Sequence, residues 1–154
     1  MRRIVLALAA GAAVIVSFAL ATHGTSAAPA PSAHGFTMTG SVAGGVKSAE
    51  FGQPLTFIYT EKNTGSTAQS EDLVLESLTH ASLVSIGCVQ GGGAQFNPDG
   101  QDCEPGFLSR GRSASAVFNA TITGTSGNVT ARVCLSNEGT GVVGPCQTLT
   151  VHLP

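Results

Sequence analysis

Tryptophan is absent from this 154-residue chain, tyrosine occurs once, and charged residues make up only 10% of the composition. Without tryptophan, the core cannot use the buried tryptophan that antibody domains place against their disulfide. The seven Lys and Arg residues are fewer than the nine Asp and Glu residues and form no basic stripe, so nucleic acid is not expected as a partner. No long helical period follows the first 28 residues, which excludes a helix bundle.

The longest apolar run stands at the start of the chain. Arg2 and Arg3 precede a nearly unbroken apolar stretch over residues 4–20, and small residues follow up to Ala28. This order is typical of a secretory signal peptide, so we expect residues 1–28 to be cleaved. An uncleaved membrane anchor is the alternative, but the run is short and rich in alanine for a span. We expect an extracellular or cell-envelope protein without membrane contact after cleavage.

Two further boundaries follow from composition. Residues 29–35 contain two prolines among alanine and serine, and we expect a flexible spacer there. The folded domain should then occupy residues 36–154.

Four cysteines lie in the exported part of the chain. An even number of cysteines in an oxidising compartment indicates two disulfides, although spacing alone permits three pairings. Cys134 and Cys146 fall on the outward faces of two neighbouring expected strands, where they can meet across the ladder. We therefore predict the pairs Cys134–Cys146 and Cys88–Cys103. The second pair would close a glycine-rich stretch and stabilise the fold by about 3 kcal/mol in the chain-entropy model.

The segment Gly52–Ser66 shows the clearest single strand. Leu55, Phe57 and Tyr59 alternate with Thr and Ile, so one face can enter a core. The run 63–65 (Asn-Thr-Gly) closes the strand with residues that tolerate the positive φ of a turn.

Further alternating or short apolar segments predict strands at 36–42, 73–75, 83–86, 113–123, 129–135 and 149–153. Phe118 belongs to an inward row of the 113–123 segment. The stretch 87–106 is rich in Gly and Pro and is expected to be a long loop or a ragged hairpin without regular elements. Regularly spaced strands with Gly-rich turns indicate an all-β, immunoglobulin-like antiparallel sandwich.

Acidic residues offer the main candidates for a site. Asp99, Asp102 and Glu104 lie close together in sequence and carry oxygens of the kind that Ca²⁺ prefers, but they lack EF-hand spacing. We interpret them as a solvated turn beside a disulfide. Glu61 and Glu71 could form a carboxylate pair of the glycosidase kind. They flank a turn, however, where surface acids are expected.

Other catalytic or metal-binding patterns are weak. His34, His80 and His152 share no metal-ligand spacing. No Gly-x-Ser-x-Gly elbow is present. Arg110 and Arg112 flank a glycine ahead of a strand and are expected to solvate the tip of a turn. We predict no catalytic, cofactor-binding or metal-binding residues, and no enzyme.

The segment Gly52–Ser66 resembles the small immunoglobulin-like repeat of bacterial surface proteins known as domain of unknown function eleven. Further matches are Glu76, Leu78, Leu83–Ile86, Leu108, Gly111, Ser113, Ala114 and the run 127–130. Thr79 stands where the family usually has proline, and the Cys134 and Cys146 pair is not expected in it. The resemblance implies an immunoglobulin-like fold without catalytic residues.

These observations predict a secreted or cell-envelope β-sandwich module with a structural or binding role. Its partner would be an unknown extracellular protein or a cell-wall component. The alternative is a small-ligand carrier of the neocarzinostatin type, in which the loop 91–106 would form one wall of an apolar cleft.

Overall fold

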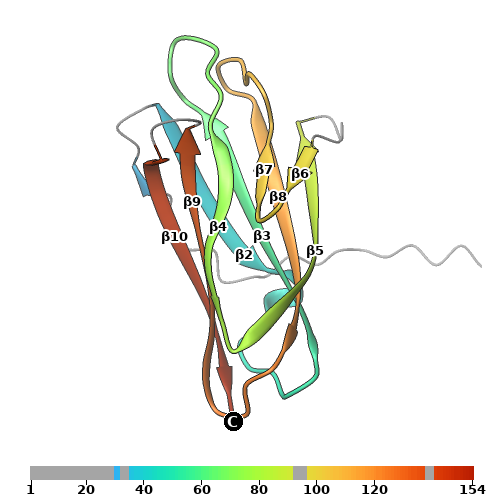
Figure 1. Cartoon of the computed structure of the whole chain (residues 1–154). Helices are drawn as coiled ribbons and strands as arrows, with labels where there is room; N and C mark the ends of the chain where they lie inside the picture. Colours follow the sequence, from blue (N-terminus) through green and yellow to red (C-terminus); the bar gives the residue numbers. More distant parts are fainter. Residues whose placement is uncertain (1–29, 32–34, 92–96, 138–140) are drawn as a thin grey trace, which may run out of the picture.

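A computed structural model describes residues 30–31, 35–91, 97–137 and 141–154, and within them the chain is all-β (Figure 1). The expected signal peptide at 1–28, and residues 29 and 32–34 of the expected spacer, lie outside the described residues. In the part of the chain that the structure describes, no helix is long and apolar enough to cross a membrane.

Two antiparallel sheets of five strands each form a sandwich. The first sheet has the order β1 (Ala30–Pro31), β2 (Phe36–Val42), β3 (Pro54–Asn63), β8 (Ser113–Ile122) and β5 (Ala81–Gln90). The second has the order β10 (Gly141–Leu153), β9 (Gly127–Asn137), β4 (Asp72–Thr79), β7 (Asp102–Glu104) and β6 (Asn97–Asp99). One turn of 3-10 helix, η1 (Ala43–Gly45), follows β2.

The strand order confirms the immunoglobulin-like sandwich. The series β2-β3-β8-β5 and β10-β9-β4 reproduce the ABED and GFC sheets of an immunoglobulin constant-type domain. The hairpin β6–β7 is an addition between β5 and β8, and it extends the second sheet beside β4. The prediction that residues 87–106 hold no regular element is therefore wrong, whereas the hairpin that it allowed is present as β6–β7. Strand β5 continues to Gln90, and β6 and β7 obtain their hydrogen bonds from each other and from β4.

Strands β3 and β8 form the centre of the first sheet and alternate in burial as expected. Leu55, Phe57 and Tyr59 are buried, and Phe57 lies directly opposite Phe118 in the ladder. The rings of Tyr59 and Phe118 meet edge to face, with centroids 6.1 Å apart. Such burial contributes about 1.5 to 3 kcal/mol for each large apolar side chain. The other predicted inward rows, on β8, β9 and β10, are also buried.

Tyr59 also connects the two sheets. Its hydroxyl donates a hydrogen bond of 2.6 Å to the carbonyl oxygen of Ala131 on β9. Burial raises the pKa of Tyr59 well above its usual range, so the hydroxyl remains a donor. Strands β3 and β9 correspond to the two strands that the disulfide of antibody domains joins. A side-chain hydrogen bond therefore links the strands that a covalent bond joins in antibodies.

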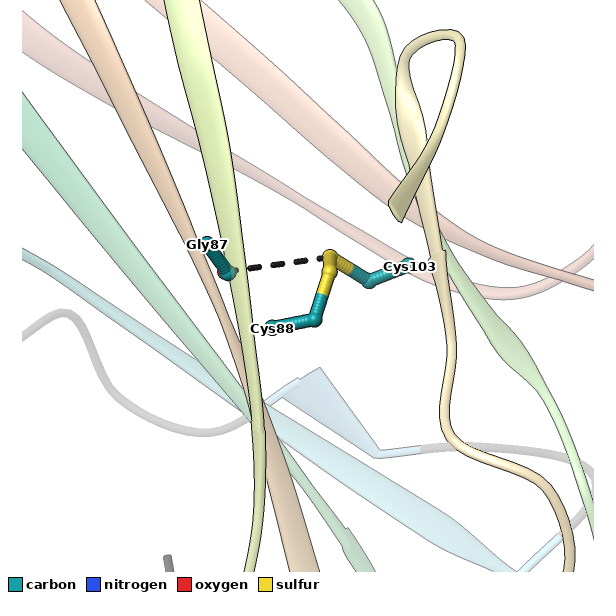
Figure 2. Close-up of a disulfide and its surroundings, with 3 residues drawn as sticks. All are labelled: Gly87, Cys88 and Cys103. Carbon is teal, nitrogen blue, oxygen red and sulfur yellow. Dashed lines mark hydrogen bonds between the residues drawn. A yellow bond between two sulfur atoms is a disulfide. The ribbon is translucent and has the colours of Figure 1, made fainter. Parts of the chain in front are cut away.

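Both predicted disulfides are present. Cys134 and Cys146 are direct ladder neighbours within the second sheet, with Cα atoms 4.0 Å apart. Cys88 on β5 and Cys103 on β7 join the two sheets, with Cα atoms 5.8 Å apart (Figure 2). The sulfur of Cys103 also lies 3.8 Å from the carbonyl oxygen of Gly87. A disulfide sulfur carries no proton, so we interpret this approach as packing rather than hydrogen bonding.

Candidate functional site

A pocket of about 690 Å³ opens at one end of the sandwich. Residues of the β3–β4 and β7–β8 connections help to line it, and these loops rise at the top of Figure 1. We call this region the pocket end. The polar side chains of the lining are Gln69, Ser70, Glu71, Asp72, Asn97, Glu104 and Asn137. Phe107 completes the rim with a side chain that is 80% exposed.

Asn63, the last residue of β3, holds the two loops of the pocket end together. Its Nδ2 donates to the carbonyl oxygens of Thr67 and Leu108, at 2.8 and 2.7 Å. Its Oδ1 accepts a hydrogen bond of 2.8 Å from the amide of Gly65. Gln69 and Leu108 then exchange two backbone hydrogen bonds between the loops. One buried side chain therefore fixes the rim, because each of its polar atoms has a backbone partner.

Glu61 and Glu71 are buried, which corrects the prediction that they are surface acids beside a turn. Glu61 continues the inward row of β3 after Tyr59, and its side chain is 0% exposed. Glu71 is 6% exposed and stands in phase with Leu73, on the inner side of the second sheet. The two carboxyl groups therefore enter the interior from opposite sheets, at the pocket end.

The environment of Glu61 disfavours its charged form. Burial, followed by the nearby charges of Glu71 and Asp72, raises the pKa of Glu61 to about 9. Neither carboxyl oxygen of Glu61 has a hydrogen-bond partner among the described residues. At neutral pH this residue is therefore a protonated acid with unused hydrogen-bonding capacity.

A raised pKa beside a second carboxylate is also the arrangement of a glycosidase acid. That chemistry requires both carboxyl groups to reach the bond that is cleaved. Glu71 lines the pocket, but Glu61 does not and is fully buried. The pair is thus not placed on the two sides of a substrate.

The added hairpin builds one wall of the pocket. Asn97 of β6 and Glu104 of β7 line it. Cys103 faces Leu73 of β4 in the ladder and ties the hairpin to β5 through its disulfide. This wall is thereby fixed to both sheets.

The three acids considered for Ca²⁺ all lie on the added hairpin, where Asp99 and Asp102 are ladder partners. Glu104 lines the pocket, whereas Asp102 pairs with Val74 in the ladder. The side chain of Asp99 lies outside the described residues. Among the residues that the structure describes, no three His, Cys, Asp or Glu side chains are grouped to hold a metal ion.

The remaining candidate residues lie apart from the pocket. His80 and His152 both contact Asn128, through its carbonyl oxygen at 2.9 Å and its side-chain oxygen at 3.3 Å, respectively. His34 lies outside the described residues. Arg110 and Arg112 are exposed as expected, and Arg112 donates a hydrogen bond of 2.9 Å to the carbonyl oxygen of Gly91.

The expected wall of a carrier cleft is partly present. Asn97, Glu104 and Gly106, from the stretch 91–106, line the pocket, while residues 92–96 lie outside the described residues. Seven of the ten lining residues carry polar side chains, however, and the carrier alternative requires an apolar lining.

The sequence contains a pattern that predicts the burial of Glu61 and Asn63, although both residues are polar. The period of two in β3 continues without a break from Leu55 to Asn63, so phase alone places both residues inside. Phe107 and Gln69 gave no such signal, because both lie outside the expected strands and their place depends on contacts between loops.

No family model and no curated protein matches the chain. The surface-repeat resemblance of Gly52–Ser66 therefore stays a prediction.

Several solved structures are similar. A conjugative transposon lipoprotein from Bacteroides eggerthii is 11% identical, with a TM-score of 0.39, over 77% of this chain and 97% of that one.

The major pilin subunit of Bacillus cereus is 9% identical, with a TM-score of 0.45, over 77% of this chain and 40% of that one. AvmM, which catalyses macrocyclization in alchivemycin A biosynthesis, is 12% identical, with a TM-score of 0.45, over 75% of this chain and 88% of that one. These proteins range from a pilin to a catalyst, so likeness at this level carries no functional argument.

Proposed function

We propose that the protein is an exported, non-catalytic immunoglobulin-like module that works in the cell envelope or outside the cell by binding a partner. The observation that carries this proposal is the complete pairing of the four cysteines, none of which is free. Disulfides of this kind persist in oxidising compartments. The signal-like start of the chain supports the same location.

The pocket end is the proposed binding site. Its lining comes from loops and a short hairpin that are held on a rigid sandwich, as is common in binding modules. Its volume of about 690 Å³ lies within the range of ligand sites. No histidine, cysteine or lysine is among the described residues that line it.

A module of the bacterial surface-repeat type fits this proposal, with an extracellular protein or a cell-wall component as the partner. The resemblance of Gly52–Ser66 and the immunoglobulin-like strand order support it. The Cys134–Cys146 pair, which departs from the repeat pattern, would then be a feature specific to this chain.

The location is tested by producing the full chain in bacteria and fractionating medium, envelope and cytoplasm. We expect a product that lacks about the first 28 residues, as intact mass will show, and that does not react with maleimide. A cytoplasmic product with reactive thiols would reject the proposal.

The binding role is tested by recovering the protein from medium and cell wall with whatever co-purifies. We expect a companion molecule that is lost from a Glu104→Lys variant and retained by a Glu76→Lys variant. Glu76 is exposed on β4 and does not line the pocket, so it controls for the change in charge. Equal recovery with both variants would place the binding site elsewhere.

A further inference from the structure

The pocket presents hydrogen-bond acceptors and negative charge. Glu71, Asp72 and Glu104 supply three carboxyl groups around one opening, and none of its described lining residues is basic. Acidic groups gathered in a concave site focus the potential and raise the local concentration of cations. The charge of the site therefore favours a positively charged ligand.

Buried polar atoms without partners lie at and beside this lining. Glu61 approaches the acidic lining from the opposite sheet, is 0% exposed, and has no hydrogen-bond partner for either carboxyl oxygen among the described residues. The Oε1 atom of Gln69, which lines the pocket, is also buried without a partner there. Burying such atoms unpaired is unfavourable. A ligand that donates a hydrogen bond to the Oε1 atom of Gln69 would relieve that cost at the lining.

Phe107 supplies an apolar face at the rim. Its side chain is 80% exposed, so its face is accessible to a ligand at the opening. An aromatic face beside carboxylates suits a cation that is flat and weakly hydrated, because such a group can stack on the ring and still donate hydrogen bonds.

We propose that this pocket binds the guanidinium group of an arginine side chain on an exposed segment of a partner polypeptide, and the proposal rests on the binding role given above. A guanidinium group offers five donors in a plane and can pair with a carboxylate through two parallel hydrogen bonds. A lysine ammonium offers three donors and stacks less well on an aromatic ring. A metal ion fits less well, since no group of three potential ligands exists among the described residues.

The test uses the exported, oxidised protein and a short acetylated and amidated peptide with one arginine between glycines. The same peptide with citrulline has nearly the same shape without the charge. Titration at pH 7 and low salt is followed by amide chemical shifts. We expect shifts at residues 69–72 and 104–107, and at least about tenfold weaker binding of the citrulline peptide.

Matched variants locate the site. Glu104→Gln and Phe107→Ala should each weaken binding of the arginine peptide by about fivefold or more. Glu76→Gln and Phe51→Ala make the same changes at exposed positions outside the pocket, and should leave binding unchanged. Binding that does not respond to the pocket variants would overturn the proposal.

Further arms separate the possible failures. Equal binding of the same peptide with lysine in place of arginine, or of free spermidine, would show a general amine site and overturn the arginine assignment. If none of these cations binds, but the co-purifying companion is still lost from the Glu104→Lys variant, the guanidinium inference fails and the proposed function stands. If the arginine peptide binds but the chain is retained in the cytoplasm, the proposed function fails and the guanidinium inference stands.

Discussion

Strand β3 passes through two different interiors. In its first half, Leu55, Phe57 and Tyr59 are buried among apolar side chains of both sheets. In its second half, Glu61 and Asn63 are equally buried and follow the same alternation, but they are polar. The first half fills a core, and the second half reaches the pocket end.

The two polar residues also differ from each other. Asn63 uses its side-chain amide fully, with hydrogen bonds to the two loops of the pocket end. The carboxyl group of Glu61 has no hydrogen-bond partner among the described residues. A satisfied buried polar group stabilises a fold, whereas an unsatisfied one destabilises it. Places where a sequence violates this rule are often functional, and Glu61 marks the pocket end in this way.

The largest expected effect is in the apolar half. Phe118→Ala should lower the free energy of unfolding by about 3 to 5 kcal/mol, because it opens a cavity opposite Phe57. Denaturant unfolding measures the loss. Val117→Ala, at the outward neighbouring position, should cost much less. An unchanged midpoint for Phe118→Ala would contradict the apolar character of this half.

Removing the Cys88–Cys103 disulfide, which fixes one wall of the pocket, tests the pocket end. Replacing Cys88 and Cys103 together by alanine should lower the free energy of unfolding by about 3 kcal/mol. The disulfide then no longer restricts the unfolded chain, and this value corresponds to a loop of such length. Replacing Cys134 and Cys146 should cost a similar amount, since the two sequence separations are 15 and 12. Only the first pair of substitutions should shift the amide signals of residues 104–107. Equal shifts from both would show that the hairpin does not depend on its cystine.

The charge of Glu61 gives a pH test with a definite sign. Its pKa is raised from 4.5 to about 9, so between these values the folded protein binds a proton that the unfolded chain has released. This residue therefore makes unfolding easier as pH rises from about 4.5 to 9. Glu61→Gln should remove that dependence and stabilise the protein by about 1 to 3 kcal/mol at pH 7.

Thermal melts of both proteins from pH 4 to 9 measure the difference, and most other titrations cancel in the comparison. A variant that is less stable than the parent at pH 7 would show instead that Glu61 is charged and paired in the fold.

The smallest expected effect is at the boundary between the two halves. Tyr59→Phe removes the hydrogen bond to the carbonyl oxygen of Ala131 but keeps the ring against Phe118. We expect a loss of about 1 kcal/mol, measured by denaturant unfolding. A loss as large as that for Phe118→Ala would mean that the bond between the sheets outweighs ring packing.

Much of the sandwich followed from the sequence because its strands are locally periodic. The inward residues of β8 and of the first half of β3 repeat every second position, so phase alone fixed their faces. The pairing of Cys134 and Cys146 followed from the same phase. These are properties of single strands and of hairpin neighbours.

The pocket end was less predictable because it depends on contacts between distant segments. Strand β7 is three residues long and pairs with β4, and no local sequence pattern predicts this pairing. The burial of Glu71 becomes apparent only when the second sheet is placed opposite Glu61. The residue type of Glu61 also led to a wrong prediction. A carboxylate beside a turn usually lies on the surface, but the alternation of β3 places this one inside.

The hydrogen bonds of Asn63 have a consequence for local opening. Because one side chain holds both loops, the amides of Gln69, Leu108 and Gly111, whose partners all lie within this network, should exchange with deuterium as one cooperative unit. The rim of the pocket would then open and close as a whole rather than loop by loop. Admission of a bound group would in that case be a single event with a single free energy, set at one asparagine.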